Sequence, residues 1–164
     1  MGSKTPISTS FNLPNGEEVT LETGKLATQA HGSCVVKIGK TMLFCSVVSA
    51  KEVREGQPFF PLSVDYQEKF AAAGRIPGNF FKRETRLSDY EVLTSRLVDR
   101  AIRPLFPDGY MNDTQVIINL ISGEEDRLPD AYTALAASTA LSVSDIPWAG
   151  PISEVRVAKV DGEY

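Results

Sequence analysis

Short runs of β-forming residues fill the first third of the chain and predict antiparallel strands. Two such runs, at 9–13 and 19–23, flank the turn-forming segment Pro14-Asn15-Gly16. A second pair, at 33–38 and 41–49, is separated only by Gly39-Lys40, as in a two-residue hairpin. Counting outward from this turn places Cys34 opposite Cys45 in a hydrogen-bonded pair, whose side chains diverge. We therefore expect two free, buried thiols.

The remaining pattern alternates between strands and helices. Strands are predicted at 59–66, 114–121 and 151–160, and an ordered loop at 67–86, which contains two glycines and a proline. Ser88 and Glu91 fit a capping box, so a helix should begin there and run to about Arg103, before Pro104. The alanine-rich segment 130–143 predicts a second helix, packed closely against a sheet.

These elements predict one α+β domain over residues 9–164, preceded by a disordered or non-native leader at 1–8. Asp161-Gly162 is a strong hairpin signal, yet only two residues follow it. We therefore expect the returning strand to be missing and the domain to be incomplete at its C-terminal end.

Composition excludes several classes of protein. The chain has 164 residues, of which 42% are apolar and 23% charged, as is ordinary for a globular protein. It contains no apolar run long enough to span a membrane and no signal-peptide core. Two cysteines do not make a disulfide framework, which indicates a reducing, cytoplasmic location. The net charge of −4 argues against a surface that is basic throughout, but not against a local nucleic-acid site.

Basic residues gather between positions 74 and 103, and within this segment Phe80 and Phe81 directly precede Lys82 and Arg83. Aromatic rings stack on unpaired bases and cations meet phosphates, so this arrangement suits single-stranded RNA. The alternative is that the two rings anchor a loop in the core while the charges are solvated.

Three arginines of the first predicted helix share one face, because Arg96, Arg100 and Arg103 follow the i, i+4, i+7 spacing. On the other side of the helix fall Tyr90, Leu97, Val98 and Ala101. Three like charges on one stripe require anions. These are either carboxylates of the chain itself, Asp99 included, or a phosphate or RNA backbone.

Candidate catalytic groups are scarce. His31 is the only histidine, so a histidine-based triad or zinc cluster has almost no material. The loop Gly123-Glu124-Glu125-Asp126 precedes a predicted helix, where phosphate often binds, but its three carboxylates would repel a phosphate. Three adjacent acids on a loop are also more often solvated than bound to a metal. We expect neither a catalytic residue nor a metal ligand in this chain.

Longer motifs occur in a characteristic order: LETG at 21–24, FFPL at 59–62, YQE at 66–68, AGRIPG at 73–78, FFKRE at 80–84, RAIRPLFP at 100–107, IP at 146–147 and GP at 150–151. Together they resemble the first ribonuclease PH-like domain of the bacterial polynucleotide phosphorylase family, from about Phe11 onward. Ordered motifs of this combined length are far more specific than any single short pattern.

The resemblance implies a fold, the ribonuclease PH-like (ribosomal protein S5 domain 2-like) sheet with packed helices. It also implies an activity. In this family three chains form a ring, and each chain carries two ribonuclease PH-like domains followed by KH and S1 RNA-binding domains. Inorganic phosphate cleaves RNA from its 3′ end with the help of Mg²⁺ and releases nucleoside diphosphates.

Site residues follow from the same resemblance. Phe80, Phe81, Lys82 and Arg83, with Arg86 close by, match the family loop that lines the neck of the RNA channel. This family usually has arginine at position 82, and the lysine of this chain keeps the charge but lacks the planar fork of a bidentate phosphate contact. Arg96, Arg100 and Arg103 match family arginines that face an active site formed with the second domain.

The family's serine-rich phosphate loop and catalytic aspartates lie in that second domain. We therefore expect this chain to guide RNA, to help build the ring and to be inactive alone. A different class of function stays open, namely a non-catalytic RNA-binding subunit of an exosome-like ring.

Overall fold

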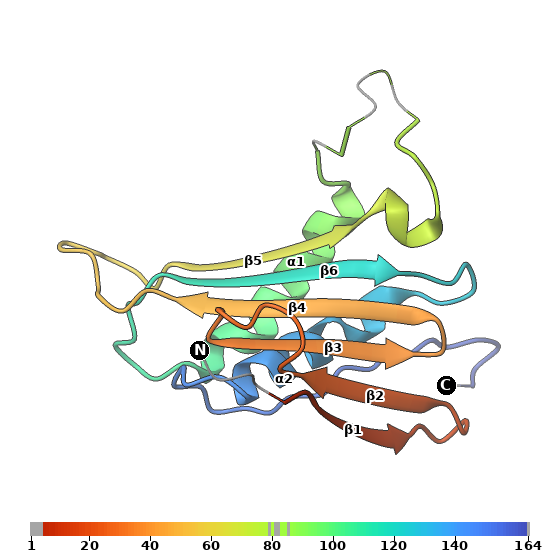
Figure 1. The fold of residues 1–164 in the computed structure, drawn as a ribbon, viewed down its shortest axis with the longest axis horizontal. Helices are drawn as coiled ribbons and strands as arrows, with labels where there is room; N and C mark the ends of the chain where they lie inside the picture. The colour runs from red at the N-terminus through yellow and green to blue at the C-terminus, as the bar shows by residue number, and fades with distance from the viewer. Residues whose placement is uncertain (1–4, 79, 81–82, 85, 164) are drawn as a thin grey trace.

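The fold, a computed structural model that describes residues 5–78, 80, 83–84 and 86–163, is a six-stranded sheet with two helices on one face (Figure 1). The strands are β1 (Ile7–Asn12), β2 (Glu18–Thr23), β3 (Gly32–Ile38), β4 (Thr41–Ser49), β5 (Leu62–Glu68) and β6 (Thr114–Ser122). Their order is β1-β2-β3-β4-β6-β5, so β6 lies between β4 and β5, antiparallel to β4 and parallel to β5. The α+β expectation is confirmed.

The β3–β4 hairpin has the register predicted from its turn. Ile38 pairs with Thr41 and Cys34 pairs with Cys45. Both thiols are free and buried, as expected. Burial raises the pKa of Cys34 to about 12, because the apolar surroundings disfavour a thiolate. The two cysteines therefore belong to the core.

Both helices pack on the same face of the sheet. Helix α1 (Asp89–Ile102) lies along β5, while α2 (Thr133–Ser142), which follows a short 3-10 helix at Pro129–Tyr132, packs on β3 and β4. The approach of α2 is close, because a Cβ added to Gly32 would lie 2.0 Å from the carbonyl oxygen of Ala140. The small residues of α2 therefore do pack closely against the sheet, as predicted.

The predicted strand at 151–160 is wrong. This segment forms no ladder with the sheet and instead binds α2. The backbone N–H of Ile152 donates to the Ser138 hydroxyl (2.9 Å), and the Glu154 carboxylate accepts from the N–H of Ala134 (2.7 Å) at the start of the helix. Alternating valines favoured a strand, but the backbone groups of this segment find partners on a helix. Asp161-Gly162 does form a tight turn, at φ of 51° and 92°.

Several other element boundaries also differ from the prediction. Strand β5 begins at Leu62, not Phe59, and a short 3-10 helix at Phe70–Ala73 occupies part of the predicted loop. Strand β1 begins at Ile7, not at position 9, and Ile7 and Ser8 pair with β2. Within the described part of the chain, no helix is long and apolar enough to cross a membrane.

Candidate nucleic-acid interface

The outer edge of β5 is covered by side chains of the segment that follows it, in place of another strand. Successive outward backbone N–H groups donate to these side chains: Tyr66 to the Ser95 hydroxyl (2.9 Å), Glu68 to the Glu91 carboxylate (2.8 Å) and Phe70 to the Glu84 carboxylate (2.5 Å). We call these three bonds the side-chain ladder. An uncovered edge strand would present these groups to other chains, and the ladder instead ties α1 and the preceding loop to the sheet.

The same edge explains the position of Arg103. Its guanidinium donates to the carbonyl oxygens of Phe60 and Leu62, each at 3.1 Å, and to both carboxylate oxygens of Asp99, at 2.6 and 3.1 Å. It also lies over the Phe60 ring, 5.6 Å from the centroid. For Arg103 the structure therefore shows the intramolecular alternative, because its charge is bound within this domain.

Arg96 and Arg100 are placed differently. Both are exposed, and neither forms an ion pair with a described residue. They line an open hollow of about 660 Å³ beside the edge of β5, together with Leu93 and Leu97. Two of the three arginines of the predicted stripe thus remain available to an external anion.

The buried side of α1 is unusually polar, and it consists of Glu91, Thr94, Ser95, Val98 and Ile102. Of the four residues placed opposite the arginines, only Val98 is buried, while Leu97 is 56% exposed and Ala101 is exposed. The reason is the ladder, because a helix that covers a strand edge must point hydrogen-bonding groups inward. Leu93 and Leu97 consequently face solvent next to the free arginines.

The connection between β5 and α1, at 69–87, is here called the protruding loop, and beyond the short 3-10 helix its described residues extend away from the sheet (Figure 1). Phe80 is 95% exposed, so it does not anchor the loop in the core. Arg83 and Arg86 are exposed, and neither has an ion pair with a residue that the structure describes. Phe81 and Lys82 lie outside the described residues.

Three carboxylates in this region are occupied by contacts within the domain. Glu84 accepts from the Phe70 backbone, Glu91 accepts from the backbones of Glu68 and Ser88, and Asp99 binds Arg103. Four arginines are left without a described carboxylate partner, and we call them the free arginines: Arg83, Arg86, Arg96 and Arg100. A chain of net charge −4 therefore presents concentrated positive charge here.

The acidic loop after β6 carries its own counter-cations. Glu124 pairs with Arg127 at 3.4 Å, and Glu125 lies 3.5 Å from Arg75. Arg127 also binds Glu17 of the β1–β2 turn, which lowers the pKa of that carboxyl to about 2. Among the described residues, no group of three histidine, cysteine or acidic side chains could hold a metal ion. Arg127 thus links the acidic loop to the β1–β2 turn, which is a structural role.

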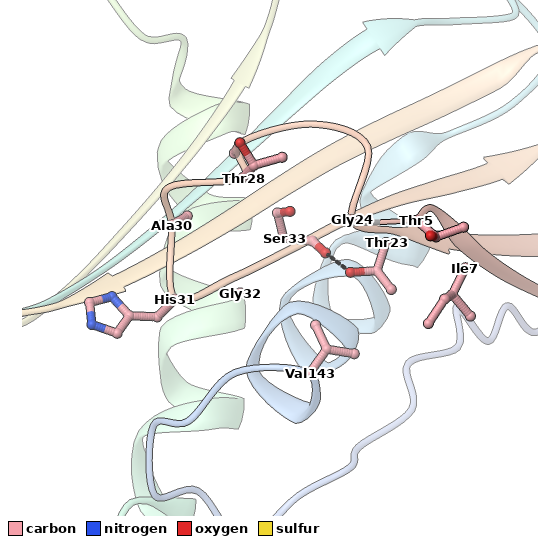
Figure 2. A pocket seen from close by; sticks show the side chains of 11 residues that line it. Thr5, Ile7, Thr23, Gly24, Thr28, Ala30, His31, Gly32, Ser33 and Val143 are labelled. Carbon is pink, nitrogen blue, oxygen red and sulfur yellow. Dashed lines mark hydrogen bonds between the residues drawn. The ribbon is translucent and has the colours of Figure 1, made fainter. Parts of the chain in front are cut away.

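A second hollow, of about 500 Å³, lies where the loop after β2 passes the end of α2 (Figure 2). Two of its hydroxyl groups are engaged within the domain, because Thr23 donates to the Ser33 carbonyl and Ser33 donates to the Leu26 carbonyl, each at 2.7 Å. The His31 ring accepts from the Ser49 backbone N–H at 3.3 Å and points away from Thr23 and Ile7. This hollow offers no set of groups for catalysis.

Sequence reasoning missed the residues that hold this surface in place. Glu84, Ser95 and the second contact of Glu91 were not singled out. One signal was present, since Glu84 is a carboxylate inside a run of cations, FFKRETR at 80–86. A single negative charge there is more easily explained by a local partner than by RNA contact.

Comparisons with known proteins show which family the chain belongs to. A family model described as the 3′ exoribonuclease family, domain 1, matches residues 16–147. The chain is 62% identical over 160 residues to a polyribonucleotide nucleotidyltransferase of Cytophaga hutchinsonii, which covers 98% of this chain and 22% of that protein. It is 58% identical over 158 residues to the protein of the same name in Amoebophilus asiaticus, covering 96% and 22%.

Solved structures show the same fold at low sequence identity. An Archaeoglobus fulgidus exosome with RNA bound to the active site matches with a TM-score of 0.55 and 19% identity, over 88% of this chain and 53% of that one. This likeness concerns the fold alone. The chain spans 22% of the length of the two curated relatives named above.

Proposed function

The chain belongs to the 3′ exoribonuclease family as its domain 1, and from this premise we propose that it guides RNA and builds the ring of a phosphate-dependent 3′-to-5′ exoribonuclease. The whole protein would be a polyribonucleotide nucleotidyltransferase. Its identity of 62% to such a protein, over 98% of the chain, is the observation that carries the proposal. The same observation favours an enzyme over a non-catalytic ring subunit.

The protruding loop and the free arginines are the proposed RNA-contacting surface. Phosphate contacts position a strand without reading its sequence, so guanidinium groups without carboxylate partners suit a channel through which any RNA must pass. An exposed aromatic ring such as Phe80 can stack on an unpaired base. Phe81, Lys82, Arg83 and Arg86 belong to the same proposed surface on the basis of the family loop.

The chemistry is assigned to the rest of the longer protein. An oxygen of inorganic phosphate attacks the phosphorus of the terminal phosphodiester, the bond to the 3′ oxygen of the preceding nucleotide breaks, and a nucleoside diphosphate leaves. A Mg²⁺ ion, with ligands outside this chain, would supply positive charge near the phosphoryl group. Arg96 and Arg100 would face this site from domain 1 and bind anionic oxygens, while Arg103 holds the helix that carries them.

The proposed assembly is a cytoplasmic homotrimer. In it, the second ribonuclease PH-like domain and the KH and S1 domains of the same chain complete the machinery. The free cysteines agree with a reducing compartment. The exposed Leu93 and Leu97 beside Arg96 suit a surface covered by another domain.

The test replaces Arg83 and Arg86 by alanine in the full-length protein that contains this chain. We expect weaker binding to single-stranded RNAs of every sequence, and a salt dependence flatter by about 0.7 in log–log slope per lost phosphate contact. Release of nucleoside diphosphates from RNA and phosphate should fall at limiting RNA and recover at saturating RNA.

Lys51→Ala is the matched control, because Lys51 is an exposed cation in the β4–β5 connection, at the far end of the sheet from the protruding loop (Figure 1). It should leave binding and slope unchanged. Unchanged RNA binding and slope in the Arg83/Arg86 variant would contradict the proposed surface. An absence of diphosphate release by the unaltered protein would contradict the proposed reaction.

A further inference from the structure

Both arms of the protruding loop meet at Glu84. On the first arm, Phe70 donates its backbone N–H to the Glu84 carboxylate at 2.5 Å, and the Lys69 ammonium lies 3.6 Å from the other carboxylate oxygen. The first arm then turns through Gly74, whose N–H donates to the Ala71 carbonyl at 3.0 Å. Glu84 therefore closes the base of a loop that carries Phe80 and Arg83, and Arg86 follows this closing contact by two residues.

Glu84 is also the outermost member of the side-chain ladder. The two inner bonds, Glu68 to Glu91 and Tyr66 to Ser95, join β5 to helix α1 itself. The third bond joins Phe70 to Glu84, which precedes the capping residue Ser88 in the chain. This bond therefore fixes the loop and not helix α1. Loss of Glu84 should therefore release the loop while the two inner bonds keep β5 and α1 together.

From this geometry we infer that Glu84 is a positioning residue, which holds the protruding loop in the orientation that contacts RNA. The inference rests on the proposed function of that loop. Glu84 does not touch RNA itself, because its two oxygens face the backbone of Phe70 and the ammonium of Lys69. It acts by ordering Phe80, Arg83 and Arg86 before RNA arrives, which lowers the entropy lost on binding.

Removal of Glu84 should change RNA affinity in opposite directions, depending on whether its charge or its positioning role matters. This difference makes the inference testable. Glu84→Ala deletes a negative charge beside a basic loop. If charge alone mattered, RNA affinity would rise, because local repulsion of phosphates would fall. If position matters, affinity falls although the loop has become more positive.

The experiment compares Glu84→Ala, Glu84→Gln and Arg83→Ala/Arg86→Ala in the full-length protein containing this chain, with a labelled single-stranded RNA and inorganic phosphate. We expect Glu84→Ala to raise KM for RNA about fivefold to tenfold with kcat within about twofold, because ordering is lost but chemistry is not. Glu84→Gln keeps an oxygen that can accept from Phe70 and should restore KM to within about twofold of the original.

Two further measurements separate positioning from general damage. Trypsin should cut after Arg83 and Arg86 faster in Glu84→Ala than in the unaltered protein, because an untethered loop is more accessible, while the thermal midpoint stays within about 2 °C. Glu55→Ala removes an equal charge from the exposed connection between β4 and β5 and should change neither KM nor cleavage.

The outcomes are distinguishable. A KM that falls or stays constant in Glu84→Ala, while Arg83→Ala/Arg86→Ala raises it, overturns the positioning role and leaves the proposed function standing. A KM that is constant in both variants overturns both. Failure of glutamine to restore KM also overturns the inference, since the role assigned to Glu84 is acceptance of the Phe70 hydrogen bond.

Discussion

Arg103, the C-cap residue of α1, follows Arg100 by three residues, and their guanidinium groups are in opposite situations. Arg103 binds Asp99 and two backbone carbonyls of the β5 edge, whereas Arg100 is exposed beside an open hollow and has no described carboxylate partner. The difference arises from what lies four residues earlier on the same face. For Arg103 this is a carboxylate, Asp99, and for Arg100 it is another cation, Arg96.

Asp99 is spaced to form an ion pair with either Arg96 or Arg103, because it lies three residues after Arg96 and four before Arg103. The backbone of β5 decides between them. Only at Arg103 do the carbonyls of Phe60 and Leu62 add two further hydrogen bonds to the ion pair. We call an arginine locked when its guanidinium is bound within the domain and thereby stabilises the fold. Contacts with the strand edge make Arg103 a locked arginine, whereas the free arginines are exposed.

The largest expected effect is on stability, from Arg103→Ala. This change removes four hydrogen bonds and leaves two partly buried carbonyls and the Asp99 carboxylate without their partner. Hydrogen bonds to charged groups contribute about 1.5–3 kcal/mol each at most, and Arg103 is partly exposed, so we expect a loss of about 2–3 kcal/mol. Urea unfolding at equilibrium measures it.

Arg100→Ala is the matched control, one exposed arginine on the same helix. It should change the free energy of unfolding by no more than about 0.5 kcal/mol. Equal losses in the two variants would break the distinction between locked and free arginines.

A smaller effect concerns Arg127, the second locked arginine, through its partner Glu17. Their ion pair lowers the pKa of Glu17 to about 2 from an ordinary value near 4.5. A carboxyl whose pKa is lower in the folded state contributes stability above its unfolded pKa, and that contribution is lost as the pH falls from about 4.5 toward about 2.

Glu17→Gln should therefore reduce stability at pH 7 and show a flatter loss below pH 4.5, measured by urea midpoints across this range. Glu18→Gln, at the neighbouring exposed position, is the control and should follow the unaltered chain. Identical acid profiles for Glu17→Gln and the unaltered chain would mean that Arg127 is not held by this carboxylate.

Local signals gave much of the fold from sequence alone. The Gly39-Lys40 turn predicted the β3–β4 register down to the Cys34–Cys45 pair, and the capping box at Ser88 and Glu91 forms as expected. Both depend on residues close in sequence. The position of β6 between β4 and β5 depends on distant residues, and no local pattern encodes it.

The polar core face of α1 could not be predicted for the same reason. Spacing placed Leu97 on the side of the helix opposite the arginines, yet Leu97 is exposed, while Glu91 and Ser95 are buried. The partners of these two polar groups are backbone N–H groups of β5, more than twenty residues earlier. In the same way, sequence could group Arg96, Arg100 and Arg103 on one face but could not show that Arg103 alone has carbonyls to bind.

The smallest expected effect is that of Arg96→Lys/Arg100→Lys on RNA affinity in the full-length protein. A free arginine that meets a phosphate as a point charge can be replaced by lysine, whereas one that grips two oxygens with its planar fork cannot. Both arginines are exposed and have no described carboxylate partner, so no contact within the domain fixes the plane of either guanidinium, which favours the point-charge contact. We therefore expect the RNA affinity of the double lysine variant to stay within about threefold, with an unchanged salt slope. The double alanine variant should have a slope flatter by about 1.4, from two lost contacts.

Arg103→Lys provides the contrast, because an ammonium cannot reproduce a guanidinium that binds Asp99 and two carbonyls together. In this variant stability should fall without a change in salt slope. A loss in the double lysine variant as large as in the double alanine variant would show that Arg96 and Arg100 hold their anion by shape, as Arg103 holds the strand edge.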